Sequence, residues 1–316
     1  MTGPRRRERA AAGSSGFLKR SQPRHGEKVV MVLLAAASLV SVLTTVGIVI
    51  ALIPPAAEFF QKVSFGDFIT GTEWSPLFKP PHFGVLPLVT ATLMVTVIAL
   101  LVAVPLGLGA AVYLSEYARP RVRSVFKPVL EVLAGIPTVV YGFFALKAVT
   151  PLLQDIWPGD DGPQVFNALS AGFVMGIMII PTVASLSEDA MSAVPQDLRD
   201  GAFALGSSRM QVSTKVVFPA ALSGIVAAVV LGISRAIGET MIVAVAAGGR
   251  PNLSFDPLEG MQTMTAFIAA AGIGDLPTGS TGYQTIFAVG SLLFVMTLVM
   301  NLVSIRLVRR YREVYE

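Results

Sequence analysis

The sequence predicts an all-α polytopic membrane protein with six transmembrane helices, and three observations support this fold class. Of the 316 residues, 53% are apolar and 14% are charged, whereas a soluble domain carries about 25% charged residues. Four runs of at least 23 residues contain no charged side chain. Lysine and arginine are concentrated in alternate segments between the apolar runs. Together these features argue against a soluble globular protein.

The four uncharged runs predict the clearest spans. A bilayer core of about 30 Å takes roughly 20 apolar residues in helical form. The runs are residues 29–53, 83–115, 165–187 and 282–305. The first run follows residues 1–28, a basic segment whose Gly, Ser and Pro content predicts disorder. An apolar run of 25 residues is too long for a cleaved signal peptide, so we expect a retained membrane anchor.

Two further spans contain charged residues. Residues 128–148 carry Glu131 and Lys147 near the ends of the run, and residues 216–249 carry two charges closer to the centre. Both runs still predict membrane crossings. The apolar run 261–274 has only 14 residues, a length that favours a short interfacial or re-entrant helix.

Six spans place both termini on one side of the membrane, and the basic residues predict which side. Nineteen of the 24 lysines and arginines fall in residues 1–28, 116–127, 188–215 and 306–312. Cytoplasmic loops carry such an excess. Both tails, the second being residues 306–316, are therefore predicted to be cytoplasmic, and residues 54–84 form an external loop. The basic excess is a topology signal, so no nucleic-acid partner is expected. The N-terminal tail could also bind membrane lipid or a partner, but plain positive-inside anchoring is the favoured interpretation.

The residue types present exclude several kinds of chemistry. The chain has no cysteine and two isolated histidines, His25 and His82, so no metal centre is expected. None of the seven lysines is followed by Ser or Thr, which excludes the nucleotide-binding loop that needs this pair. Catalysis, metal binding and cofactor binding are therefore not expected on this chain.

Glycines inside the apolar runs predict close packing between helices. Gly107 and Gly109 lack the third glycine of a dinucleotide-binding fingerprint and lie inside a span. Ala168, Gly172 and Gly176 recur every four residues, so they lie on one helix face. Small residues on one face allow neighbouring backbones to approach closely.

Arg235 and Glu239 are the strongest local signal in the sequence. If the fifth span covers residues 220–245, Arg235 lies near the bilayer midplane and Glu239 one turn further out. A charge at that depth costs at least about 2.5–3.5 kcal/mol. The two side chains could neutralise each other, but Arg before Glu is the less favourable order on a helix. A solute pathway is the favoured interpretation, in which Glu239 either holds Arg235 or repels a wrongly charged solute.

An arginine suits one class of solute in particular. Its planar guanidinium gives two directed donors and stays charged at any working pH, which fits a tetrahedral oxyanion. Gly135, Pro137 and Tyr141 add a second feature, because helix-breaking residues stand here inside the third predicted span. They predict either a broken helix that lines a cavity or a simple proline kink.

Residues 188–218 are polar enough to leave the membrane. Glu188 and Asp189 predict a helix start, and a short amphipathic helix follows Pro195. About 30 residues is long for a connector, which favours docking to another protein.

This segment resembles the coupling loop of the membrane subunits of ABC importers. That loop carries Glu-Ala-Ala, three residues, Gly, nine residues and then Ile-x-Leu-Pro. The matching positions here are Asp200, Gly201, Ala202, Gly206, Val216, Phe218 and Pro219. The spacing is intact, and the departures are Asp for Glu, Gly for the first Ala, Val for Ile and Phe for Leu.

Five further stretches narrow the resemblance to phosphate importer permeases of the PstC type, over about residues 28–316. These stretches are residues 65–68, 72–76, 134–142, 235–240 and 306–311. The resemblance implies a type I ABC importer transmembrane domain in a bacterial cytoplasmic membrane, with its core at residues 85–305.

The resemblance also implies partners and roles. They are a second permease (PstA type), two ATPase subunits (PstB type) that bind ATP and Mg and grip the coupling loop, and an external phosphate-binding protein (PstS type). Arg235 and Glu239 correspond to the family's pathway residues. Three alternatives stay open: a permease for sulfate or molybdate, an ion-coupled secondary transporter, and a membrane scaffold or sensor.

Overall fold

The structure is a computed structural model that describes residues 25–157 and 161–310. It divides into two units, residues 1–51 and 52–316. Helix α1 (His25–Lys62) supplies the described part of the first unit, and its apolar side chains there are exposed. The N-terminal tail was predicted to be disordered over residues 1–28. Residues 1–24 of this tail lie outside the described part of the chain, and residues 25–28 are helical. Residues 311–316 also lie outside the described part.

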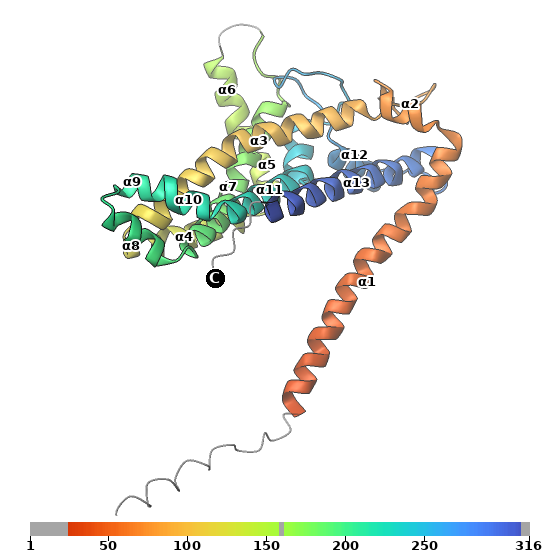
Figure 1. The fold of residues 1–316 in the computed structure, drawn as a ribbon. Helices are drawn as coiled ribbons and strands as arrows, with labels where there is room; N and C mark the ends of the chain where they lie inside the picture. The colour runs from red at the N-terminus through yellow and green to blue at the C-terminus, as the bar shows by residue number, and fades with distance from the viewer. Residues whose placement is uncertain (1–24, 158–160, 311–316) are drawn as a thin grey trace, which may run out of the picture. The chain divides into compact units, whose positions relative to one another are not determined.

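The described helices confirm an all-α polytopic fold with five apolar spans, or six if a bent helix pair counts as one span (Figure 1). Five are long and apolar enough to cross a membrane, and the sixth candidate is the bent pair. The five cover Lys28–Lys62, Leu86–Tyr117, Thr138–Ile156, Ala168–Ser192 and Thr281–Arg306. The bent pair, Arg209–Ala220 and Leu222–Ile237, turns by 71°. The segment predicted as the fifth span is therefore interrupted by a sharp bend after Ala220.

The first helix extends further than the sequence predicts. We expected it to end at residue 53, yet α1 continues through Pro54 and Pro55. Phe59 explains this, because it is fully buried against Phe68 and other rings with T-shaped geometry. Such aromatic packing offsets the hydrogen bonds that proline removes from a helix. The predicted external loop thus begins as helix.

The rest of that loop is short and mostly folded back on itself. Helix α2 (Phe65–Thr70) is followed by strand β1 (Trp74–Ser75), which pairs antiparallel with β2 (His82–Phe83). Trp74 lies opposite Phe83 in this pair and packs edge-on against Phe267. The loop therefore covers the apolar end of the core.

The core is built on α3 (Leu86–Val112) and α7 (Ala168–Ser192). A Cβ atom added at Gly176 would lie 2.7 Å from Val102 Cβ and 2.8 Å from the Ala99 carbonyl of α3. Gly172 and Gly107 are equally close to the facing helix. The packing prediction is confirmed for these glycines, whereas Gly109 has no neighbour within 4 Å.

The third span begins at Thr138, ten residues after the start predicted at residue 128. Helix α4 (Pro120–Ala134) is amphipathic and contains no buried residue. The spanning segment is Thr138–Ile156, made of α5 (Thr138–Phe144), the π-helical turn η2 (Ala145–Val149) and α6 (Thr150–Ile156). The prediction failed because the Gly-Ile-Pro break separates α4 from the apolar helix that follows.

Short helices make up much of the C-terminal half. They are α8 (Gln196–Ala204), α9 (Arg209–Val212), η3 (Ser213–Val217), α10 (Phe218–Ala220), α11 (Leu222–Ile237), η4 (Val243–Ala247), α12 (Met264–Ile273) and the long α13 (Thr281–Arg310). Helix α12 is the short apolar helix expected at residues 261–274. Glu188 and Asp189 lie in the last turn of α7, so the predicted helix start at these residues is wrong.

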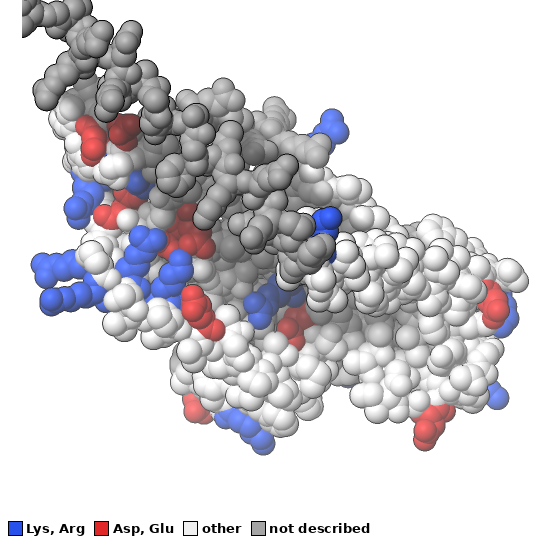
Figure 2. Space-filling model, turned by 90° about the horizontal axis from the view of Figure 1, so that it is seen from below, with Lys and Arg blue, Asp and Glu red and all other residues white. Residues whose placement is uncertain are grey.

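The second unit has two distinct ends. One end carries an apolar cluster that includes Leu88 at the start of α3 and Phe267 of α12. The opposite end carries a second cluster that joins Ala111 near the end of α3, Met191 near the end of α7 and Val217. Seen from below, charged side chains gather over this second end, at the left of Figure 2, where α4, α8 and α9 lie. Most of the remaining described surface in that view is uncharged.

Candidate solute pathway and coupling site

Arg235 stands in the last turn of α11 and reaches across to α7. Its Nη1 donates to Thr182 Oγ1 at 3.0 Å, and its Nη2 lies 3.7 Å from Met178 Sδ. Thr182 and Met178 are one turn apart on α7, so they hold the guanidinium from one helix face. Within residues 25–157 and 161–310, no carboxylate lies within ion-pair distance of Arg235. The guanidinium is thus oriented by neutral groups, and none of the described carboxylates neutralises its charge.

The Glu239 carboxylate is bound by backbone N–H groups and forms no hydrogen bond with Arg235 among the described contacts. Glu239 follows the end of α11, is 9% exposed, and its Oε1 accepts from the backbone N–H of Met241 at 2.9 Å and of Ile242 at 3.3 Å. The carboxylate therefore caps the helical turn that restarts after the break. Its own carbonyl oxygen accepts from Thr265 Oγ1 at 2.6 Å. Mutual neutralisation of Arg235 and Glu239 does not occur.

The Gly135–Pro137 stretch is a true helix break. The Gly135 N–H bonds to the carbonyl of Glu131, and α5 starts only after Pro137. The Tyr141 hydroxyl donates to the Leu133 carbonyl at 2.9 Å and so fastens α5 across the gap to α4. The structure thus favours the broken helix over the simple kink.

The two broken helices lie side by side. A Cβ atom at Gly142 would lie 3.2 Å from the Met241 carbonyl, directly after the break at Glu239. Tyr141, Ala236 and Ile242 belong to one buried cluster. The two interruptions, at residues 135–137 and near Glu239, therefore pack against each other.

The predicted coupling segment forms an exposed helix and turn. Asp200, Gly201 and Ala202 lie in α8, where Asp200 is exposed. Gly206 adopts φ +83°, a left-handed conformation that favours glycine. Beside it the Leu205 side chain is 89% exposed.

The rest of the segment returns towards the membrane span. Ser208 and Gln211 form a capping box that starts α9. Met210 in this helix is an exposed apolar residue, and so is Phe203 in α8. Pro219 is exposed in α10, just before the 71° bend. The segment thus exposes three apolar side chains, Phe203, Leu205 and Met210.

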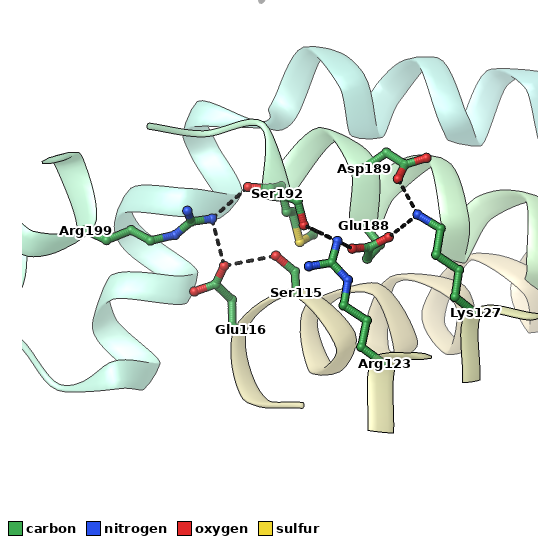
Figure 3. A network of polar contacts seen from close by, with 9 residues as sticks. Ser115, Glu116, Arg123, Lys127, Glu188, Asp189, Ser192 and Arg199 are labelled. Carbon is green, nitrogen blue, oxygen red and sulfur yellow. Dashed lines mark hydrogen bonds and ion pairs between the residues drawn. The ribbon is translucent and has the colours of Figure 1, made fainter. Parts of the chain in front are cut away.

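A polar network anchors this segment to the core (Figure 3). Glu188 in the last turn of α7 is 1% exposed and forms ion pairs with Arg123 and with Lys127, whose Nζ lies 3.1 Å from Oε2. Both cations come from α4. Ser192 adds a hydrogen bond at 3.0 Å. Asp189 accepts from Lys127 at 2.7 Å, and this bond and the one to Glu188 raise the pKa of Lys127 above 10.5. The end of α7 is therefore clasped to α4.

Sequence reasoning missed these groups. The sequence pattern indicates only a helix start at Glu188. It indicates only the membrane topology at Arg123 and Lys127. One local feature could have pointed to Thr182, because it places a hydroxyl group beside Pro181 inside a predicted span. Its partner Arg235 is 53 residues away, so the sequence alone does not pair them.

The fold and the site together define a multi-pass membrane permease with broken helices around a partly buried cation and an exposed loop helix. Residues 103–313 match the family described as "Binding-protein-dependent transport system inner membrane component". The probable ABC transporter permease protein YqgH of Bacillus subtilis is 35% identical over 267 residues, which cover 84% of this chain and 85% of YqgH.

A second relative and a solved structure agree. The phosphate transport system permease protein PstC of Mesorhizobium japonicum is 33% identical over 282 residues, with 83% and 84% coverage. A bacterial alginate ABC transporter, crystallised with its alginate-bound periplasmic protein, matches with a TM-score of 0.63 at 16% identity. The match covers 90% of this chain and 95% of that one, and it shows the fold alone. The chain belongs to the family of binding-protein-dependent transport system inner-membrane components, which are ABC importer permeases.

Proposed function

We propose that this chain is the PstC-type permease of an ATP-driven importer for inorganic phosphate. The observation that carries the proposal is Arg235, a partly buried guanidinium that neutral groups of α7 orient and that has no ion-pair partner among the described residues. An anion can use the free donors of such a guanidinium without competing with a carboxylate. The PstC protein of Mesorhizobium japonicum, whose name gives phosphate as its substrate, supports the choice of solute.

The remaining subunits follow from this proposal. A PstA-type permease completes the pathway, two PstB-type ATPases bind ATP and Mg and hydrolyse the ATP, and a PstS-type protein delivers phosphate from outside. The exposed apolar side chains of Phe203, Leu205 and Met210, three residues of one short loop segment, support docking of an ATPase. Both termini are then cytoplasmic, as the positive-inside pattern predicts.

Transport by purified components tests the function. Proteoliposomes with all four kinds of subunit should take up phosphate only when ATP is supplied on the ATPase side. Proteoliposomes with this chain alone should show no uptake under an ion gradient. Uptake by the chain alone would favour a secondary transporter, and absence of any flux would favour a scaffold. Stronger competition by sulfate or molybdate than by unlabelled phosphate would assign another oxyanion.

The absence of cysteine allows a direct test of the pathway. Thr182→Cys, beside Arg235, should react in the assembled importer with a water-soluble thiol reagent, and phosphate should slow that reaction. Phe173→Cys is the matched control, since this exposed apolar residue stands on the same helix as Thr182, nine residues away and so on the opposite face. Equal labelling of both cysteines, or no phosphate protection at residue 182, would contradict a pathway next to Arg235.

A further inference from the structure

Arg199 stands directly before Asp200 in α8, yet its side chain turns inward. Nη1 donates to the Val194 carbonyl at 2.9 Å, and Nη2 donates to the Met191 carbonyl at 2.8 Å and to Glu116 Oε1 at 3.1 Å. The side chain is 12% exposed. One guanidinium therefore joins α8, the end of α7 and the π-helical turn η1 (Tyr113–Tyr117) that ends the α3 span (Figure 3).

Only arginine can make this joint. The planar guanidinium donates hydrogen bonds to several acceptors in fixed directions, whereas the lysine ammonium is a compact charge at the end of a flexible side chain. The Met191 carbonyl belongs to the C-terminal end of α7, where a cation is also favoured by the helix dipole. Glu116 is 8% exposed and, besides Arg199, receives only the hydroxyl of Ser115 at 3.0 Å among the described contacts. The joint is thus a largely buried ion pair with additional carbonyl bonds.

The helix that Arg199 grips is the helix that holds Arg235. Met191 accepts from Arg199, and Thr182 of the same helix accepts from Arg235. Met191 follows Thr182 by nine positions, which correspond to about 14 Å of continuous helix at 1.5 Å per residue. Movement of α8 therefore has a short, hydrogen-bonded route to the candidate pathway.

We propose that Arg199 is the positioning residue that transmits displacement of α8 to α7 and α3, and through α7 to the side chains that hold Arg235. This inference rests on the proposed function, in which ATPases move α8. It assigns the transmission to one guanidinium and its acceptor Glu116, rather than to the exposed surface of the loop. A residue that only stabilises the loop would change the yield of the importer but not its stoichiometry.

The test measures phosphate taken up per ATP hydrolysed by the complete importer in proteoliposomes. Arg199→Lys keeps the positive charge but loses the directed donors of the guanidinium. Glu116→Gln keeps the shape of the side chain but loses its negative charge. Each should assemble and hydrolyse ATP, while uptake per ATP falls at least about fivefold, the lower end of typical coupling between sites. Arg121→Lys, an exposed arginine of α4, is the matched control and should leave the ratio unchanged.

The outcomes distinguish failure of the role proposed for Arg199 from failure of the proposed phosphate import. If the wild type transports phosphate and both variants keep its ratio per assembled complex, Arg199 only supports the fold and the inference is overturned. If the wild-type importer shows no ATP-driven phosphate uptake, the proposed function falls, and the inference falls with it. A loss of the ratio in both variants, with the control unaffected, supports the transmission role even where the yield of complex decreases.

Discussion

Glu188→Gln should destabilise the protein far more than the equivalent change at its neighbour, Asp189→Asn. Both changes remove one negative charge and keep the shape of the side chain. Glu188 is 2% exposed at its side chain and pairs with Arg123 and Lys127, whereas Asp189 is 53% exposed and pairs with Lys127 alone. The contrast therefore isolates the buried clasp between α7 and α4.

The magnitude follows from the exposure of the partners. Removing one partner of a fully buried pair costs about 3–5 kcal/mol. The Arg123 and Lys127 side chains are 40% and 34% exposed, so water resolvates them in part. We expect about 2 kcal/mol for Glu188→Gln, and below about 1 kcal/mol for Asp189→Asn, the range of exposed pairs.

Equilibrium unfolding in mixed detergent micelles measures both variants against the wild type. The free energy of unfolding should fall in the order wild type, Asp189→Asn, Glu188→Gln. Equal losses for the two variants would refute the reasoning, because they would mean that the Glu188 carboxylate is as solvated as that of Asp189. A gain in stability on Glu188→Gln would refute it more strongly, since burial of the charge would then outweigh its ion pairs.

Three further predictions concern packing, pH and docking. Gly176→Ala should lower the thermal midpoint, because the added Cβ meets α3, whereas Gly109→Ala should raise it through helix propensity. Because the pKa of Lys127 is raised in the folded state, its ion pairs stabilise the fold in full below pH 10.5, and this contribution is lost as the pH rises through the higher pKa of the folded state. The difference in unfolding free energy between the wild type and Lys127→Met should therefore narrow as the pH is raised above 10.5. Leu205→Ser should weaken co-purification of the ATPase without lowering the thermal midpoint, because Leu205 is exposed.

The spans could be predicted because membrane insertion depends on local composition. Uncharged runs located four helices to within a few residues, apart from the extension of α1 beyond Pro55. That extension depends on Phe59, which packs against rings from α2 and β2. The late start of the third span has a local cause, since the Gly135–Pro137 break ends α4 before the apolar helix begins. Only the first of these two boundaries depends on contacts between distant segments.

The candidate site was only partly predictable. Arg235 stood out because a charge inside an apolar run is expensive. Its orientation depends on Thr182 and Met178, which no local pattern links to it. Glu239 was placed beside Arg235 by helical spacing, but α11 ends at Ile237 and the carboxylate turns to the next backbone N–H groups. Spacing arguments fail wherever the helix itself is broken.

Phosphate uptake by Arg235 variants of the complete importer is the most direct test of the central claim, that a guanidinium held by α7 meets the solute. Arg235→Ala should reduce ATP-driven uptake by about tenfold or more, the factor that corresponds to loss of a charge-assisted hydrogen bond. Arg235→Lys should retain part of the activity, and assembly and basal ATP hydrolysis should persist in both. Full uptake by a correctly assembled Arg235→Ala importer would contradict the account.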